Sequence, residues 1–279
     1  MPFGSETWFV IMSQVLHQYG PWILSILAVS QFWIWLMMRR ISGGSRLELY
    51  ETGTVEVGFD ANGPFIALAG VLRASDREIF VHSMELTLTC DRDKSKHNFR
   101  WIAFKPNFLF PLAGNHSWEM PHPFTVSPGD PGKFNIVFHD TELFPEVKNI
   151  LQNYYHNWHE VERKIEERRS FKGKDSDYDS HEDLIKEFKH QDICVTSYNE
   201  LNQKCYWEQG GFTLLVKVMT EDGTANITRQ FKFKLGKRDS KLLKTNCVTM
   251  LDEPISTLMG KPVTYCQAVQ AEYLTDSVG

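Results

Sequence analysis

Two groups of histidines in this chain have the neighbours that a metal site needs. His116, Glu119 and His122 lie together in a proline-rich stretch, and His156 and His159 lie three residues apart where the periodicity is helical. Residues three apart share one face of a helix, so both imidazoles could reach one metal ion. The metalloprotease pattern H-E-x-x-H is absent from the sequence. Solvated helix histidines are commoner than ligands, so we expect no cofactor and keep a metal at either group as an alternative.

Nucleophilic and redox chemistry have no signature in the sequence. The five cysteines are widely separated and form no C-x-x-C pair, so we expect reduced thiols. They are Cys90, Cys194, Cys205, Cys247 and Cys266. No G-x-S-x-G, P-loop or dinucleotide motif occurs, and nothing selects one Ser–His–Asp set from the many available. A membrane-tethered hydrolase or metalloenzyme therefore remains only an alternative to a protein without catalytic activity.

Aromatic side chains offer candidate binding surfaces in residues 106–131, which contain six of the twelve prolines. Proline cannot donate a hydrogen bond within a sheet, so this stretch is predicted to be a long irregular loop or a sheet edge. Long loops in compact domains often serve function. Phe108, Phe110 and Trp118 would then bind a ligand or partner, or would instead cover the core of their own domain.

A second aromatic surface lies in residues 141–169, where the apolar period becomes helical. Apolar residues recur there at intervals of four and three. They are Val147, Leu151, Tyr154, Trp158, Val161 and Ile165. Asp140 suits the cap of this helix. We favour packing of this seam against its own domain. In the alternative, Tyr154 and Trp158 contact a partner helix or a second copy of the chain.

The most distinctive stretch is residues 22–38, seventeen residues without a charge. As a helix it would be roughly 26 Å long, which is at the short end of what spans a hydrocarbon core of about 30 Å. We predict a single-pass transmembrane helix, in which Ser25, Ala28 and Gln31 are the candidates for helix–helix contacts. A buried core helix is the alternative.

The flanking charges predict the orientation of this span. Arg39, Arg40 and Arg46 follow it, whereas no Lys or Arg precedes it. The positive-inside rule then places the N-terminus outside and the C-terminal domain in the cytoplasm. Residues 1–21 carry apolar residues on one helical face, which predicts an interfacial amphipathic helix lying on the bilayer.

The remainder is predicted to be mainly β with α: a β-sandwich-like (Ig-like) soluble part with a long helical insertion. Residues 46–140 form the first set of strands, residues 141–190 the insertion with a charged loop, and residues 191–279 a second set packed with the first. We prefer two packed β units to one interrupted sandwich. In the second set, strands are predicted at residues 193–198, 204–207, 212–220, 225–235, 244–251 and 263–271.

The charge composition of the chain limits the classes of partner that it can bind. The chain has 30 Lys and Arg against 35 Asp and Glu, a formal charge of −5, which argues against nucleic acid. We therefore expect a membrane-anchored cytoplasmic binding or sensing module whose partner, besides the lipid bilayer, is an unidentified protein or small ligand. One alternative is a membrane effector in which the β-domain senses a ligand and drives the transmembrane helices to assemble as a homo-oligomer.

Overall fold

The computed structural model describes residues 30–34, 37, 47–104, 119–172, 179–221, 225–261 and 266–274. The chain divides into two compact units, Met1–Arg46 and Leu47–Gly279. In the first unit, residues 30–34 and 37 are helical, and the rest of the predicted interfacial helix and span lies outside the described residues. Among the residues that can be described, no helix has both the length and the apolar character needed to cross a membrane.

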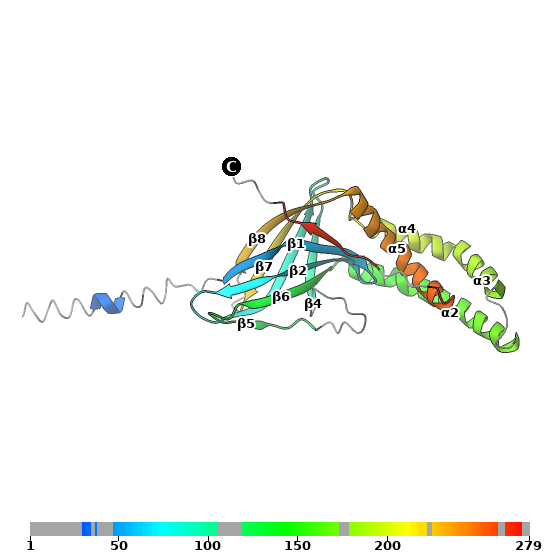
Figure 1. Ribbon diagram of the computed structural model, residues 1–279, viewed down its shortest axis with the longest axis horizontal. Coiled ribbons are helices and arrows are strands. Elements are labelled where there is room, and N and C mark those ends of the chain that lie inside the picture. Colours follow the sequence, from blue (N-terminus) through cyan, green and yellow to red (C-terminus); the bar gives the residue numbers. More distant parts are fainter. Residues whose placement is uncertain are drawn as a thin grey trace, which may run out of the picture. The chain divides into compact units, whose positions relative to one another are not determined.

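The second unit is built on one nine-stranded sheet (Figure 1). Eight strands follow the order β8-β7-β3-β4-β6-β2-β1-β9, and β5 pairs with β3 beside this path. Every pairing among the described strands is antiparallel. The strands are β1 (Leu47–Asp60), β2 (Gly63–Ala74), β3 (Ile79–Cys90), β4 (Lys96–Phe104), β5 (Phe124–Val126), β6 (Gly132–Asp140), β7 (Gly210–Thr220), β8 (Ala225–Leu235) and β9 (Val269–Glu272).

The sheet curls until its two ends meet. The bridge between Phe233 and Tyr273, and a 2.7 Å hydrogen bond from the backbone N–H of Leu274 to the carbonyl of Lys232, join the chain after β9 to β8. Alternate residues of β7, such as Leu214 and Val216, are buried in the enclosed core, whereas β6 is buried on both faces from Ile136 to Asp140. The prediction of a mainly β fold with helices is confirmed, but a single nearly closed sheet replaces two stacked sheets.

Strands from both sides of the helical stretch belong to this one sheet. β7 pairs with β3 and β9 pairs with β1, so residues 191–279 complete the first set of strands instead of forming a second unit packed beside it. The preference for two packed units is therefore corrected. Local sequence does not show which distant strands pair, because pairing depends on the curvature of the whole sheet.

The predicted long helix is present as α2 (Leu143–Lys172). Asp140 accepts hydrogen bonds from the backbone N–H groups of Glu142 and Leu143 at 3.0 and 3.1 Å, as expected for a capping residue. The whole heptad seam of α2 is buried in the core of its own unit. The favoured interpretation of the seam is thus confirmed.

Two segments predicted as strands are helical. Residues 193–198 lie in α4 (Asp192–Lys204) and residues 244–251 lie in α5 (Lys237–Leu258). β-branched residues suggested strands in both, but Thr245 and Thr249 donate side-chain hydrogen bonds to carbonyls four residues earlier, which lets threonine sit inside a helix. The predicted strand at 204–207 is wrong, since only Lys204 is in a helix there and residues 205–207 are irregular. Of residues 263–271, those from Val269 onward form β9.

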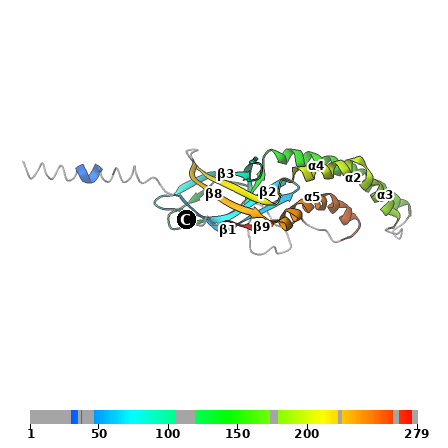
Figure 2. The ribbon, with the colours of Figure 1, turned by 90° about the horizontal axis from the view of Figure 1, so that it is seen from above.

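Helices α2, α4, α5 and the short α3 (Asp179–His190) gather beyond one end of the sheet (Figures 1 and 2). The link from α4 to β7, residues 205–209, closes this end. Trp207 of the link is fully buried and donates from its indole N–H to the carbonyl of Gly58 at 2.7 Å. Ser240 of α5 donates its hydroxyl to the carbonyl of Trp207 at 2.8 Å. The link therefore fixes α5 against β1.

Candidate functional site

The helical end of the sheet carries a cleft made of two adjoining hollows. One, of about 350 Å³, lies between the β3–β4 turn and the α4–β7 link, and we name it the thiol hollow because Cys90 and Cys205 line it. The other, of about 550 Å³, lies between α4 and α5, and we name it the lysine hollow because Lys237, Lys241 and Lys244 line it. The residues that line both are Asn202, Glu208, Gln209 and Lys244.

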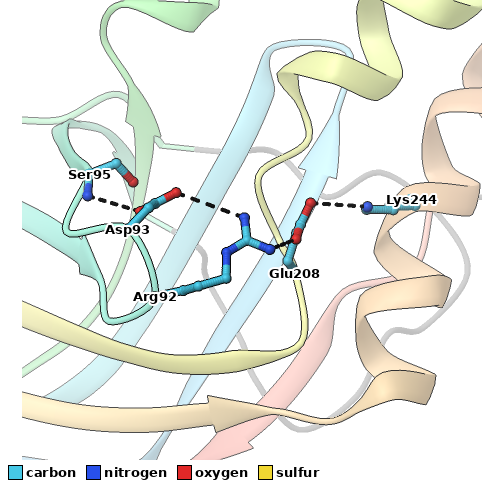
Figure 3. Close-up of polar contacts among 5 residues, drawn as sticks. All are labelled: Arg92, Asp93, Ser95, Glu208 and Lys244. Carbon is cyan, nitrogen blue, oxygen red and sulfur yellow. Dashed lines mark hydrogen bonds and ion pairs between the residues drawn. The ribbon is translucent and has the colours of Figure 1, made fainter.

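The carboxylate of Glu208 binds two cations where the hollows meet (Figure 3). Arg92 of the β3–β4 turn donates a hydrogen bond to it, and Nζ of Lys244 on α5 donates another at 3.4 Å. The hydrogen bond from Arg92, aided by the charge of Lys244, holds the pKa of Glu208 below its ordinary value. Arg92 and Lys244 are thus positioned to hold a single anionic group, and Glu208 now fills that role.

A buried polar cluster lies behind the thiol hollow. Nδ1 of His97 is 3.3 Å from Oδ2 of Asp140, and the hydroxyl of Tyr206 donates to the same oxygen at 3.1 Å. The rings of His97 and Tyr206 stack with centroids 3.8 Å apart. Tyr206 also lines the thiol hollow, so the cluster connects the hollow to the start of α2.

The protonation states in this cluster are set by its hydrogen bonds. Burial alone would lower the pKa of His97, but its hydrogen bond with Asp140 and the neighbouring Cys90 raise that pKa to about 9. Burial alone would likewise raise the pKa of Asp140, but the hydrogen bonds from His97 and from two backbone N–H groups keep it below its ordinary value. His97 and Asp140 therefore form an ion pair at neutral pH.

Cys90, His97 and Asp140 have the residue types of a nucleophile, a base and an orienting carboxylate. Cys90 lines the thiol hollow, but only 7% of its surface is exposed. Its backbone N–H already donates to the carbonyl of Ser95 at 3.0 Å, so that N–H is not free to stabilise an oxyanion. The arrangement fits a buried ion pair next to a thiol better than an assembled hydrolase site.

The lysine hollow concentrates positive charge in a chain that is acidic overall. Lys237, Lys241 and Lys244 are spaced by four and three residues, so they lie on one face of α5. Cations are disfavoured near a helix N-terminus by the helix dipole. The one acidic residue of the first turn, Asp239, accepts a hydrogen bond from the backbone N–H of Gly236 at 3.0 Å. No carboxylate within the described residues pairs with Lys237 or Lys241.

The aromatic residues predicted to bind a partner fall into two groups. Tyr154 and Trp158 are 2% and 1% exposed, and Tyr154 donates its hydroxyl to the carbonyl of Leu251 at 2.8 Å. Tyr154 thus joins α2 to α5, and Trp158 packs on Phe188 of α3 inside the molecule, which corrects their assignment to a binding surface. Phe108, Phe110 and Trp118 lie outside the described residues.

The predicted histidine groups do not assemble a metal site in the part of the chain that the structure describes. No group of three or more His, Cys, Asp or Glu side chains there has an arrangement that could hold a metal ion. His156 and His159 are exposed on α2, and His159 is 3.0 Å from the carboxylate of Glu162. His122 is 3.8 Å from the carboxylate of Glu119, while His116 lies outside the described residues.

The proline-rich stretch returns to the sheet beside a third hollow. Pro121, His122 and Pro123 line it together with β3 and β4, and its volume is about 650 Å³. β3 and β4 pair only between residues 85–89 and 96–100, and beyond these β3 pairs with β5 instead. The hollow lies where the two strands diverge. It brings together few charged groups, so the cleft is the stronger candidate site.

Of the residues predicted to mediate helix association in a membrane, Ser25 and Ala28 lie outside the described residues, and Gln31 is exposed. The described neighbours of Gln31 are exposed large apolar residues. They are Phe32, Trp33, Ile34 and Met37, each more than half exposed.

No protein-family model matches the chain, and searches of curated proteins and of solved structures found no match. Its function is therefore inferred from the chain's own geometry.

The residues of the cleft do not stand out in the sequence. Arg92 and Glu208 are 116 residues apart, and no local pattern indicates that they meet. The lysine hollow did carry a signal, because a helix that begins Lys237, Arg238 places two cations in the first turn, where the dipole disfavours them, and Lys241 and Lys244 follow on the face of Lys237. The strand predicted at residues 244–251 hides this spacing, because Lys244 would not then share a helical face with Lys237 and Lys241.

Proposed function

We propose that this chain is a membrane-anchored binding and sensing module whose ligand is a small anion held in the cleft between α4 and α5. The observation that carries the proposal is the set of three lysines that face the lysine hollow, two of them without a carboxylate partner among the described residues. Natural sequences break a local stability rule mainly where function requires it. An anion bound in the cleft would neutralise these lysines and interact favourably with the N-terminal half of α5.

A small ligand fits better than a polyanion. The three lysines of α5 line a hollow of about 550 Å³, and this volume is within the usual range of small-molecule sites. The chain as a whole carries a formal charge of −5 and would repel an extended nucleic acid.

The membrane anchor is proposed on the uncharged stretch at residues 22–38 and the arginines that follow it. The exposed side chains of Phe32, Trp33, Ile34 and Met37 suit an apolar surrounding. We propose that the cleft lies on the cytoplasmic side. Such a module would act as an effector if ligand binding caused the anchors of several chains to assemble. Gln31 would then lie in the contact between their helices.

The test uses the full chain in detergent micelles and inorganic tripolyphosphate as the probe, with binding measured by calorimetry. We expect the Lys237→Gln, Lys241→Gln double variant to weaken binding at least tenfold, since each charge pair at about 4 Å is worth about 1 kcal/mol even in water. Added salt should weaken wild-type binding as well.

The matched control is the Lys148→Gln, Lys164→Gln double variant. Both lysines are exposed on a helix, α2, and neither lines the cleft. This variant removes the same net charge and should retain wild-type affinity. Equal loss in both variants, or no binding by the wild type, would refute the proposed anion site.

A thiol-dependent hydrolase is the second candidate, and the contact of Cys90 with the His97–Asp140 pair is the observation that favours it. This candidate predicts turnover of simple thioesters or nitrophenyl esters that Cys90→Ser abolishes. Anion binding in the lysine hollow would not need Cys90, so Cys90→Ser should leave tripolyphosphate binding unchanged.

A further inference from the structure

The lysine hollow has an aromatic wall opposite its cationic face. Tyr198 of α4 lines the hollow, and 40% of its surface is exposed. Lys237, Lys241 and Lys244 line the hollow from α5. Building on the proposed anion site, we propose that the ligand is a phosphate ester that carries a planar ring, such as a nucleotide, with its phosphates on the lysines and its ring stacked on Tyr198.

The volume of the lysine hollow is larger than a single phosphate group would fill. Its volume of about 550 Å³ is many times the roughly 30 Å³ that one water molecule occupies, so a phosphate group alone would leave most of it filled with water. Ligand sites of this size are lined by apolar and aromatic side chains together with a few polar groups. Tyr198 and Val248 supply the apolar part here, and the lysines supply the polar part.

The position of Tyr198 on α4 fits a stacking role. Its neighbours toward the core, Ser197 and Leu201, are buried and hold α4 in place, whereas Tyr198 points to the hollow side. Tyrosine is rigid, with two side-chain torsions, so it presents a ring at low entropic cost. A nucleic-acid base can stack on such a ring whatever its identity, because every base has a π-face.

Polar side chains lie where the two hollows meet, and they could bind the part of the ligand between its ring and its phosphates. Asn202 of α4 and Glu208 of the α4–β7 link lie between the two hollows. An amide and a carboxylate can bind the hydroxyl groups of a sugar through hydrogen bonds. The site therefore combines, in one cleft, groups that suit the ring, the hydroxyls and the phosphates of one ligand.

The experiment compares two probes of similar charge on the full chain in detergent micelles, with a chelator present to remove divalent metals. Adenosine triphosphate carries a ring, and inorganic tripolyphosphate does not. We expect the nucleotide to bind about tenfold more tightly, within the range of one base stacked on an aromatic side chain. Tyr198→Leu should remove this advantage and leave tripolyphosphate affinity unchanged, whereas Tyr198→Phe should retain it.

Tyr50→Leu is the matched control, because Tyr50 is an exposed tyrosine on β1 that does not line the cleft. Thermal melting of each variant verifies that it is folded, and an exposed position on a helix tolerates leucine well. Equal affinity for both probes, or a nucleotide advantage that survives Tyr198→Leu, would overturn the ring site while the anion site stands. Binding of neither probe would overturn both.

Discussion

The imidazole of His97 and the carboxylate of Asp140 form an ion pair, 3.3 Å apart, that joins β4 to the start of α2. One oxygen of Asp140 pairs with His97, and the other accepts the backbone N–H groups of Glu142 and Leu143. The position of α2 therefore depends on the charge of a side chain that lies behind the thiol hollow, where Tyr206 separates the ion pair from the cleft.

Replacing His97 with Gln should flatten the dependence of the free energy of unfolding on pH between about 6.5 and 9. The folded pKa of His97 is about 9, above its unfolded value of 6.5, so the folded state binds the proton more tightly. This contribution is complete below pH 6.5 and is lost as the pH rises through 9. Its size is roughly 3 kcal/mol at 1.36 kcal/mol per pKa unit. Urea unfolding of the full chain at about pH 6 and pH 9 measures it.

His159→Gln is the control, because His159 is exposed on α2 and lies 3.0 Å from Glu162 on the same exposed helix surface. Its pH dependence should match the wild type. An unchanged slope in the His97→Gln variant would show that the His97–Asp140 pair does not stabilise the fold.

Substitutions of a lysine at the start of α5 should have opposite effects on the stability of the protein and on its affinity for the anion. Lys237 lies in the first turn, where a negative charge interacts favourably with the helix dipole and a positive charge does not. Without ligand, the free energy of unfolding should increase from the wild type to Lys237→Gln and again to Lys237→Glu, by about 0.3–1 kcal/mol per step. Affinity for tripolyphosphate should fall in the same order. Parallel losses of stability and affinity would mean that Lys237 serves the fold instead of a ligand.

The fold was predictable where local sequence decides the structure. The alternation in β3 and the heptad seam of α2 gave the correct elements, because each pattern buries one face. α4 and α5 were not predictable in this way. Their β-branched residues favour strands locally, and helix formation there depends on burying Leu201, Leu243 and Cys247 against the rest of the molecule.

The cleft was less predictable than the fold, for a related reason. Arg92, Glu208 and Lys244 come from a turn, a link and a helix that meet only once the sheet has curled and β7 has paired with β3. The ion pair of His97 and Asp140 likewise joins residues from two strands. Only the lysine spacing on α5 is a local feature.

Trp158→Ala should destabilise the protein by about 3–5 kcal/mol, because it removes a large side chain that is only 1% exposed and packs on Phe188 with ring centroids 5.3 Å apart. The melting temperature should fall by about 6–20 °C for a domain of this size. Phe144→Ala, at a more exposed position on the same helix, should change it far less. Unchanged melting together with lost self-association would instead assign the α2 seam to an interface.

The proposed anchor at residues 22–38 should orient the chain with its C-terminal domain in the cytoplasm. A reporter that is active only in the cytoplasm, fused after Gly279, should be active, because Arg39, Arg40 and Arg46 follow the uncharged stretch and none precedes it. Protease added to sealed cells should leave the domain intact, and alkaline washing should leave the chain in the membrane pellet.

Charge exchange tests the cause of this orientation. Replacing Arg39 and Arg40 with Gln, and Ser5 and Ser13 with Lys, moves the positive charge to the other side of residues 22–38 without altering the stretch itself. A fraction of the chains should then insert with the domain outside, where protease digests it. Replacing Arg73 and Arg77 with Gln removes the same number of arginines far from the stretch and should leave the orientation unchanged. Release of the wild-type chain by alkaline washing would rule out the anchor, and with it the membrane part of the proposed function.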